Sequence, residues 1–584
     1  MGALLAFQSR SGDGATAFEQ ARRHLVEQKA LAPRGEAPGA VKFARRNGSG
    51  MELARSERGW LMAAGQLDHP ELAVDDAAGL LARLEAHGET ELDRLDGFFA
   101  LIWADGDTWT VQTDAFGRLH LYTAVTGEGV YLATSSIALA HAGGAAPDPE
   151  AVWEFLATGT MYEDRTPFRG VRRLAGARRY RVAGGAIDAG RPTDAYFLPP
   201  HGGSRDGDVG TLFDEATAIT RRWVPEDSRP LPDLTGGLDS RLVVGCMLEA
   251  GHRPDVTCTG EPGDGDIDAA HRLARALDLT FLREPRAPGI AAQRAFERVV
   301  EAALWAEGEY DAAEYAAIAA IHVPHSGAFG CSVNGSGGEV FRNYWWDRRH
   351  LEQRGEGAVD LLVRRFTHNA QAPAFLAARD PAAHFRAALE RTLAARPGGI
   401  WPDLGDDAYL MLRMQCWQGA IASATNEIWP TISPLMSRRV LAALYRVPYE
   451  QRLDNHLVYD LLARFPTPFT RIPLATGFPP ARVRATHAWR FLPGLLGLPG
   501  RLWPRVKARL GWTPPDPTAA ETVRAIMAGG GADLLAPGSL KLGAVVDAAA
   551  YRTFYEAART TGSVPLSALG RLLSLEVALR ASDG

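Results

Sequence analysis

The sequence has little cysteine and no long apolar run, and each shortage excludes a class of protein. Four cysteines are spread over 584 residues and form no CxxC pair, which excludes common zinc sites and dithiol redox motifs. We interpret them as buried thiols in a reducing cytoplasm. No apolar run of about 18 residues occurs, and the N-terminus MGALLAFQSRSGDG lacks the pattern of a signal peptide. We therefore expect a soluble cytoplasmic protein without membrane contact.

An excess of positive charge is also missing. The formal net charge is -6 and the isoelectric point is near 6.2, so the composition gives no electrostatic basis for binding nucleic acid. What is present is apolar: 46% of the residues are hydrophobic, enough for at least two cores. The spacing G-x-x-x-x-G-K-[ST] of a Walker-type phosphate loop is absent, so cleavage at the γ-phosphate of a nucleotide is not expected.

The first 200 residues contain short β-rich runs separated by turns. ALLAF, WLMAAG, FFALIWAD, TWTVQTD, HLYTAV and VYLATSS alternate in a way that predicts antiparallel strands in a sandwich. Between them, AAGLLARLEAHG predicts a helix that ends at Gly88. The polar segment PPHGGSRDGDVG predicts a boundary near residues 199–210. We expect one domain over residues 1–200 and a second over 201–584.

The most informative segment, LPDLTGGLDS, lies near the start of the second domain and is followed by a buried helix. Two glycines allow a tight turn, and the N–H groups of Thr235 to Ser240 would face an anion at the helix N-terminus. Asp239 would repel a phosphate unless a cation such as Mg²⁺ lay between them. The alternative is an ordinary turn that Ser240 caps, with Asp239 in solvent. The following βα unit, PDVTCTGEPGDGDIDAAHRLARALDLTFLREP, predicts a doubly wound parallel sheet.

TGGLDS resembles the SGGxDS pyrophosphate loop of the ATP-pyrophosphatase superfamily, in the form found in asparagine synthetase-like enzymes. The resemblance implies that the loop binds ATP and Mg²⁺ while a carboxylate attacks the α-phosphate, releasing pyrophosphate and leaving an acyl-adenylate. It also implies an adenine pocket along Thr257 to Gly260. The implied nucleotide-binding residues are Leu234, Thr235, Gly236, Gly237, Leu238, Asp239, Ser240, Thr259 and Gly335. We interpret Asp264, Asp266 and Asp268 as a solvated loop and helix cap.

A second glycine-rich turn, GSGGE, resembles the second active-site loop of asparagine and β-lactam synthetases. The match places Glu339 where the family has a metal-binding aspartate, so Asp239 and Glu339 form the implied Mg²⁺ pair. A one-residue shift would instead match Glu339 to the glutamate that follows. Ser336 then stands where asparagine synthetase has a glutamate and β-lactam synthetase a tyrosine. We expect Ser336 to orient a substrate, because serine alone is a poor base.

Two later segments resemble other catalytic parts of the family. In ATNEIWPTISPLMS, Glu427 is the candidate general base, with a structural helix cap as the equal alternative. In FTRIPLATGFPP, Ala475 takes the position of the family's catalytic lysine, and Arg471 is the candidate for the missing positive charge. The tail from His487, with Trp489, Trp503 and Trp512, predicts a helical outer layer; binding of a peptide or an anionic surface is the alternative.

The N-terminal 200 residues resemble the glutamine amidotransferase domain of asparagine synthetases, an Ntn-hydrolase-like sandwich. The resemblance rests on LDRLDGFFALIWAD, TDAFGRLHLYTA and YLATSS. That domain uses an N-terminal cysteine to release ammonia from glutamine, whereas position 2 here is Gly2 and the first cysteine is Cys246. We expect no glutamine hydrolysis. Gln66, Asp68 and His69 fall at family glutamine-binding positions, and we interpret them as a surface turn.

Three departures from the family pattern, at Gly2, Ser336 and Ala475, disfavour asparagine synthesis and β-lactam closure. A chain of this length with an inactive glutaminase domain resembles lasso peptide cyclases, which adenylate an Asp or Glu side chain of a precursor peptide. The peptide's N-terminal amine then closes a macrolactam, and tethering replaces part of the missing acid–base machinery. Expected partners are a precursor peptide, a leader-binding protein and a leader peptidase. The alternatives are an amide or β-lactam synthetase for a small carboxylic acid, and a nucleotide-binding pseudoenzyme scaffold.

Overall fold

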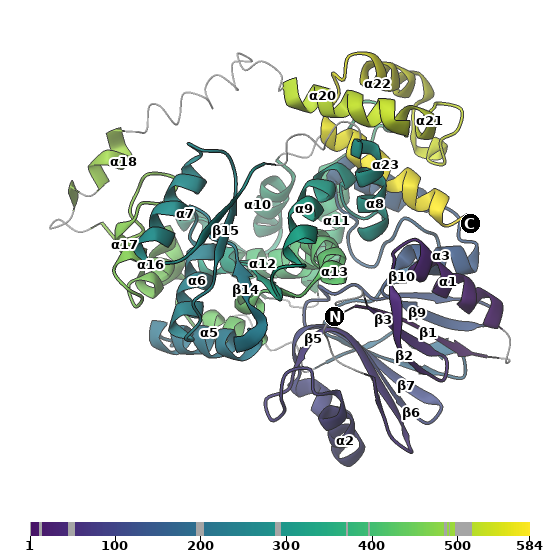
Figure 1. Cartoon of the computed structure of the whole chain (residues 1–584), viewed down its shortest axis with the longest axis horizontal. Helices are drawn as coiled ribbons and strands as arrows, with labels where there is room; N and C mark the ends of the chain where they lie inside the picture. The colour runs from purple at the N-terminus through teal and green to yellow at the C-terminus, as the bar shows by residue number, and fades with distance from the viewer. Residues whose placement is uncertain are drawn as a thin grey trace.

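The computed structural model places two sheet systems in one chain and surrounds the second with helices (Figure 1). It describes the following residues: 2–10, 14–44, 53–193, 204–286, 294–368, 372–394, 398–483, 488–489, 491–496 and 517–583. Most of the tail from His487, including Trp503 and Trp512, lies outside these residues, as does the expected domain boundary near residue 200. Among the described residues, no helix combines the length and the apolar character needed to cross a membrane.

The first sheet system is an antiparallel sandwich, as the alternating runs predict. One sheet has the strand order β10-β8-β9-β1-β3-β2 and the other β12-β11-β7-β6-β5-β4, with β13 beside β11. The strands of the first sheet are β1 (Ala3–Ser9), β2 (Ala32–Ala37), β3 (Ala40–Ala44), β8 (Tyr122–Val125), β9 (Gly129–Ala133) and β10 (Val171–Arg173). Those of the second are β4 (Ala54–Arg55), β5 (Gly59–Asp68), β6 (Asp96–Asp105), β7 (Thr108–Thr113), β11 (Arg178–Ala183), β12 (Ala186–Ile187) and β13 (Arg191–Pro192).

Both faces of the first sheet are buried, which explains why β1 is apolar at consecutive positions. Leu4 and Ala6 pack into the core between the sheets, together with residues such as Met62. Ala3 and Leu5 point the other way, into the core that includes α1 (Ala15–Glu27) and α3 (Ser136–Gly143). The second sheet carries α2 (Ala77–His87), which ends at Gly88 as expected, on its outer side.

The second sheet system is parallel. β14 (Pro230–Pro232), β17 (Cys331–Val333) and β18 (Thr431–Ile432) pair in parallel, as do β15 (Val256–Thr259) and β16 (Phe281–Glu284). A parallel bridge between Asp233 and Thr257 joins the two groups into the order β16-β15-β14-β17-β18. The order reverses between β14 and β17, and ligands of doubly wound sheets bind at such a switch point. Both predicted active-site loops follow these two strands, so the α/β fold class is confirmed where it matters for the site.

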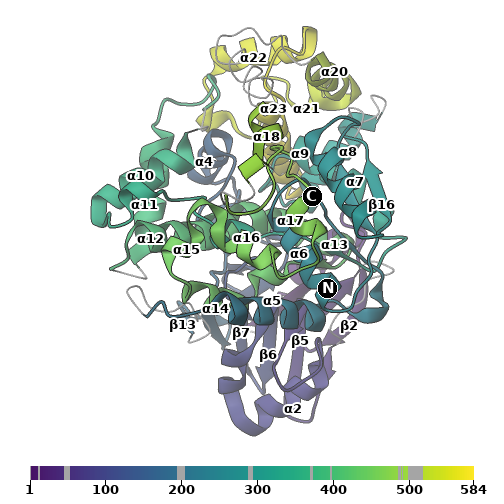
Figure 2. The same ribbon diagram turned by 90° about the vertical axis from the view of Figure 1, so that its left-hand side faces the viewer.

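Helices link and cover this sheet (Figure 2). α5 (Val209–Trp223) precedes β14, and α6 (Asp239–Glu249) and α7 (Gly265–Ala276) follow β14 and β15. α8 (Ala295–Trp305) and α9 (Ala312–His325) precede β17, and both pack against the last helix, α23 (Leu566–Ala581). Further helices of the structure are α4 (Pro149–Thr158), α10 (Gly355–Thr367), α14 (Arg438–Tyr445), α17 (Pro468–Arg471), α20 (Pro517–Ile526) and α22 (Ala548–Thr560).

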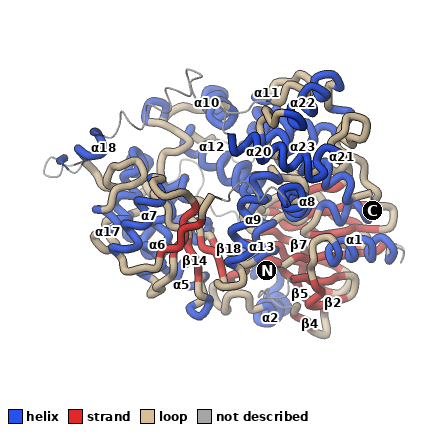
Figure 3. The backbone as a smooth tube through the Cα atoms, turned by 45° about the horizontal axis from the view of Figure 1, so that its top comes forward, coloured by secondary structure: helices blue, strands red, loops and turns tan. Residues whose placement is uncertain are grey.

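One continuous helical run extends from Trp401 to Ile428, and its first and last helices are labelled α12 and α13 in Figure 3. Its first part is α12 (Trp401–Ala408) and its last part α13 (Gly419–Ile428). Between them the backbone widens into a π-helix over Tyr409–Gln418. Such widened turns occur often at functional sites, and this one begins at a residue that contacts the second active-site loop.

Candidate active site

The first loop, residues 233–238, connects β14 to α6 and is closed by its own hydroxyl groups. The N–H of Thr235 donates to Ser240 Oγ over 3.0 Å, and the two hydroxyl oxygens lie 2.9 Å apart. The N–H of Gly237 donates to Thr235 Oγ1 over 3.1 Å. Leu234 and Leu238 are buried in the core, so only their backbone atoms can reach a ligand. The threonine that replaces the family serine therefore shapes the turn.

Three of the N–H groups expected to face an anion, those of Thr235, Gly236 and Gly237, already donate to protein acceptors. Besides the bonds from Thr235 and Gly237, the N–H of Gly236 donates to Asp266 Oδ1 over 3.0 Å. Asp266 is exposed in the first turn of α7, as the interpretation of a solvated helix start predicts, and its carboxylate also occupies a position on the loop that an anion could take. Asp264 precedes the first turn of α7 and accepts the N–H of Glu261, which agrees with the expected cap region.

The second loop packs directly against the first. A Cβ at Gly335 would lie 2.9 Å from the carbonyl carbon of Asp239, and one at Gly338 would lie 2.3 Å from Asp239 Cγ. Gly337 adopts a φ of +91°, which favours glycine. Only a glycine-rich segment can therefore approach Asp239 this closely. The predicted meeting of the two loops is a property of the fold.

Asp239 and Glu339 lie close enough to influence each other. Asp239 Oδ2 accepts from Arg342 over 2.5 Å, while Oδ1 is buried without a hydrogen-bond partner among the described residues. Burial raises the pKa of Asp239 to about 6; Arg342 opposes this rise and Glu339 adds to it. An unpaired buried carboxylate oxygen is costly unless something binds it. The pair fits a divalent cation that takes its other ligands from phosphate oxygens.

Few protein side chains are available to bind the proposed metal ion. Among the described residues, no group of three or more His, Cys, Asp or Glu side chains could hold a metal ion. Mg²⁺ at nucleotide sites commonly uses one or two carboxylates together with substrate phosphates, so Asp239 and Glu339 are compatible with Mg²⁺ bound alongside a nucleotide and not with a metal held by the protein alone. Their assignment as metal ligands remains a prediction.

Two residues at this site were not predicted. Arg342 follows Glu339 by three residues at the end of the short 3-10 turn Gly338–Phe341, and its position beside the metal candidate was the available signal. Tyr409 donates from its hydroxyl to Glu339 Oε2 over 2.5 Å. Burial and the nearby Glu339 raise the pKa of Tyr409 well above its ordinary value, so it stays a neutral donor. Nothing in the sequence links Tyr409 to Glu339, because the π-helix that presents it is a tertiary feature.

The structure places Ser336 within the second loop, where its N–H donates to Asn334 Oδ1 over 3.1 Å. The same oxygen accepts from Ser433 Oγ over 2.9 Å, which fixes the loop to the segment after β18. Thr259 is the last residue of β15, the strand beside β14, and is exposed. These positions are compatible with ligand binding, and the roles assigned to Ser336 and Thr259 stay predictions.

Glu427 lies in a different environment from the one expected of a general base. Both of its carboxylate oxygens accept from Lys29 Nζ, over 2.9 and 3.1 Å, and Lys29 also pairs with Glu307. Lys29 follows α1 of the sandwich, so this buried cluster ties the two sheet systems together. Both carboxylate oxygens are therefore engaged by a buried ammonium group, and Glu427 lies inside α13 and not at a helix cap. The structure gives Glu427 a place in the cluster that joins the two sheet systems, and its role as a general base stays a prediction.

The segment with Ala475 contacts the first loop, but Arg471 does not share that contact. The N–H of Ala475 donates to the carbonyl of Gly236 over 3.0 Å, and a Cβ at Gly236 would lie 2.6 Å from Ala475 Cβ. The buried Arg241 holds this segment to α6 by donating to the carbonyls of Ile472 and Pro473. Arg471 ends α17 and is exposed. Within the described part of the chain, the cation that contacts the site is Arg342.

Two of the candidate glutamine-binding residues of the sandwich, Gln66 and Asp68, bind the second sheet system, and the third, His69, binds within the sandwich. Gln66 Nε2 donates to the carbonyl of Trp223 over 2.8 Å, and Asp68 Oδ2 accepts from Trp223 Nε1 over 3.0 Å. His69 Nε2 lies 3.0 Å from Glu91 Oε2. All three are at most 7% exposed, so the interpretation as a surface turn is wrong. Trp223 ends α5, and these polar groups hold that end against the sandwich.

The backbone conformation and the surroundings of position 2 favour the glycine that occupies it. Gly2 is buried with a φ of +101°, and a Cβ there would lie 2.0 Å from the carbonyl oxygen of Phe43. A cysteine could not take this backbone conformation without a local shift. Residues 2–193 contain no cysteine at all. The absence of the nucleophile in the sandwich is therefore accompanied by a backbone that does not accommodate one.

Comparisons with known proteins bear on the sandwich. A family model described as a glutamine amidotransferase domain matches residues 67–195. A glutamine phosphoribosylpyrophosphate amidotransferase from B. subtilis aligns at 10% identity and a TM-score of 0.23, covering 48% of this chain and 65% of its own. A structure of the allosteric regulatory enzyme of purine biosynthesis aligns at 11% identity and a TM-score of 0.21, covering 50% and 75%. A search of curated proteins gave no match. By the family model, residues 67–195 resemble a glutamine amidotransferase domain.

Proposed function

We propose that this chain is an ATP-dependent, AMP-forming amide ligase of the asparagine synthetase type that closes a macrolactam in a precursor peptide. The observation that carries the proposal is the contact of two glycine-rich loops around Asp239 at the switch point of the parallel sheet. The similarity of the N-terminal region to amidotransferase domains supports the family context.

In the proposed reaction, a side-chain carboxylate of the peptide attacks the α-phosphorus of ATP and pyrophosphate leaves. The peptide's N-terminal amine then attacks the activated carbonyl carbon, loses a proton, and AMP leaves as the amide forms. Mg²⁺, when bound, neutralises phosphate charge. Asp239 and Glu339 would hold that ion, and Arg342 compensates the charge of Asp239. Tyr409 fixes the orientation of Glu339.

The lack of an ammonia source in the described N-terminal region favours an amine that belongs to the substrate itself. The described N-terminal region has no cysteine to release ammonia, and its polar groups at Gln66 and Asp68 are occupied by Trp223. An amine on the same molecule as the activated carboxylate needs no separate ammonia source. The two loops are equally compatible with a free small acid and a separate amine. Exchange assays with each kind of substrate distinguish the two reactions.

The test is ATP–pyrophosphate exchange by the full chain, with a ribosomal precursor peptide, with small carboxylic acids, and with neither. Exchange that requires the peptide supports the cyclase, and exchange with a small acid alone supports the amide synthetase. ATP binding without exchange under any condition would leave a nucleotide-binding scaffold and overturn the proposal.

Asp239→Asn should reduce exchange on the order of 100-fold or more, because it removes a ligand from the proposed ion. Glu249→Gln is the matched control, since Glu249 is an exposed carboxylate at the opposite end of α6. Near-normal exchange in Asp239→Asn would contradict the metal assignment.

A further inference from the structure

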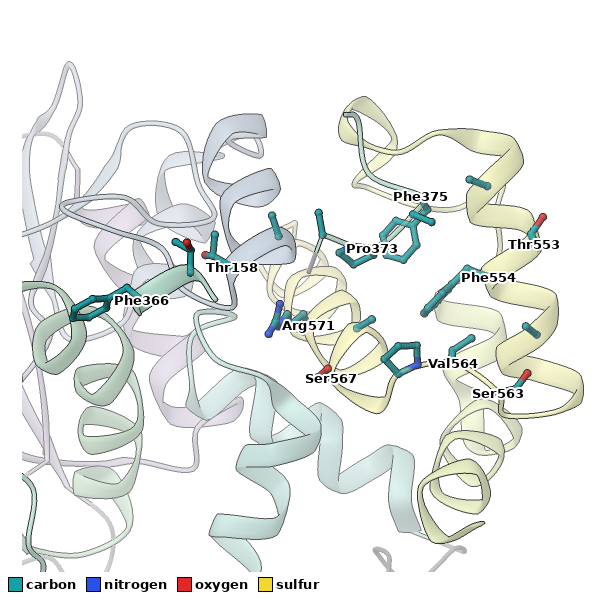
Figure 4. Close-up of a pocket in the computed structure, with 18 of the residues that line it drawn as sticks. Thr158, Phe366, Pro373, Phe375, Thr553, Phe554, Ser563, Val564, Ser567 and Arg571 are labelled. Carbon is teal, nitrogen blue, oxygen red and sulfur yellow. The ribbon is translucent and has the colours of Figure 1, made fainter. Parts of the chain in front are cut away.

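A cavity of about 680 Å³ lies apart from the two loops, between the end of α4, the end of α10 and the C-terminal helices (Figure 4). Its volume is in the range of sites for small organic ligands. Its walls come from several separate parts of the chain: residues 157–162, 366–367, 372–375, 550–557 and 563–571. The space is therefore made by the tertiary fold and not by one surface loop.

The walls are mostly apolar and aromatic. Phe366, Phe375, Phe554 and Tyr162 line the space, with prolines and alanines between them. The rings of Phe375 and Phe554 pack edge to face at 4.8 Å between centroids, so this wall is held in place. Such a lining favours a ligand with an aromatic or branched aliphatic body.

Arg571 is the one charged residue among those that line the cavity. It rises from α23, and Figure 4 shows its guanidinium group between Thr158 on one side and Pro373 on the other. Arg571 donates from Nη1 to the carbonyl of Leu156 over 3.1 Å, at the end of α4. Its Nε is buried and has no hydrogen-bond partner among the described residues. The group thus has unused donor capacity in an apolar space.

No carboxylate in the described part of the chain forms an ion pair with Arg571. Asp311 and Glu314 contribute at longer range and raise its pKa, but burial has the larger effect and lowers the pKa below its ordinary value. A guanidinium group binds a carboxylate through two parallel N–H donors with good geometry. An incoming carboxylate would pair directly with the guanidinium group, which Asp311 and Glu314 do not.

We propose that this cavity binds an apolar carboxylate, with the carboxylate on Arg571 and the aromatic or branched body against Phe375 and Phe554. Two sources share this chemistry: a free small acid and the C-terminal end of a peptide. The inference does not depend on the proposed ligase reaction, because binding is measured without ATP.

The test uses calorimetric titration of the full chain with three probes. N-acetyl-Leu-Phe carries a free carboxylate, N-acetyl-Leu-Phe-amide is the same molecule without the charge, and 4-phenylbutyrate is the small acid. We expect the dipeptide acid to bind about ten-fold or more tightly than its amide, because only the acid pairs with Arg571. Binding of 4-phenylbutyrate with the same dependence on Arg571 would indicate free acids as the source. Binding of the dipeptide acid alone would indicate peptide ends.

Arg571→Met should remove the preference for the acid. Arg524→Met is the matched control: Arg524 also donates to a carbonyl after a helix, that of Thr561, but it does not line the cavity. Ala557→Trp fills the cavity from α22 without touching a charge and should abolish binding of both peptides. Thermal melts establish that each variant is folded. Equal binding of acid and amide, a preference that survives Arg571→Met, or no binding of any probe would overturn the proposal.

Discussion

The candidate ligand-binding residues of the two sheet systems differ in whether all of their polar atoms have protein partners. In the sandwich, the candidate glutamine-binding residues Gln66, Asp68 and His69 each have a protein partner. In the parallel sheet, Asp239 keeps a buried oxygen with no partner among the described residues. An unpaired buried polar atom calls for an explanation, and a bound ligand is one. The contrast supports a structural role for Gln66, Asp68 and His69 and the proposed ligand-binding role for Asp239.

The largest expected effect tests the structural side of this contrast. Lys29→Met would leave Glu307 and Glu427 buried without their cation, and should lower the free energy of unfolding by about 3–5 kcal/mol. The measurement is the midpoint of urea unfolding. Lys541→Met breaks an exposed pair with Asp583 and should cost at most about 1 kcal/mol. Equal stabilities of the two variants would show that the buried cluster does not hold the sheet systems together.

A second change tests the chemical side. Gly338→Ala places a Cβ 2.3 Å from Asp239 Cγ, so the loop or the carboxylate must move. We expect ATP–pyrophosphate exchange to fall roughly 100-fold, since displacement of a catalytic group by about 1 Å has effects of this size. Gly143→Ala is the control, because its new Cβ meets no atom within 4 Å. Full exchange in Gly338→Ala would show that the reaction does not depend on the close contact between the two loops.

A third, smaller effect is the dependence of exchange on pH. Because the pKa of Asp239 is raised to about 6, its carboxyl group is ionised above this pH and protonated below it. Cation binding needs the ionised form, so exchange should decline below pH 6 by up to about ten-fold per pH unit. Higher Mg²⁺ should shift the decline to lower pH. A profile that is flat from pH 5 to 8, or one insensitive to Mg²⁺, would argue against Asp239 as a ligand.

The last variant, Gly2→Cys, is expected to have no effect on glutaminase activity. Gly2→Cys supplies the missing nucleophile type, yet we expect no glutaminase activity, because the backbone at position 2 leaves no room for a Cβ and Gln66 and Asp68 are engaged by Trp223. Ammonia release from glutamine is the measurement, with the parent chain as the blank. Measurable release would mean that the sandwich retains a glutamine site.

The sequence predicts those features that depend on local pattern. FFALIWAD and TWTVQTD lie in β6 and β7, and AAGLLARLEAHG forms α2 with its end at Gly88, because alternation and capping are local signals. The meeting of the two loops also follows from the strand order of a doubly wound sheet. Tyr409 could not be predicted, since its contact with Glu339 spans 70 positions and depends on the π-helix.

The features that the sequence does not predict share one physical origin. A single sequence does not predict the pairing of Glu427 with Lys29, because the two residues are 398 positions apart. Gln66 and Asp68 were placed on a surface because the pattern of one domain contains no information about what packs on it. Pairing partners of buried charges are set by tertiary structure, which a single sequence does not reveal.

The contact between Asp266 and Gly236 has a consequence for the entropy of ligand binding. The carboxylate holds the first loop in its turned conformation while no other anion is present. An anion that binds there exchanges one charged acceptor for another, so the loop does not have to fold at the moment of binding. Affinity would then reflect the difference between two acceptors, and association should show little of the heat-capacity change that accompanies the ordering of a loop.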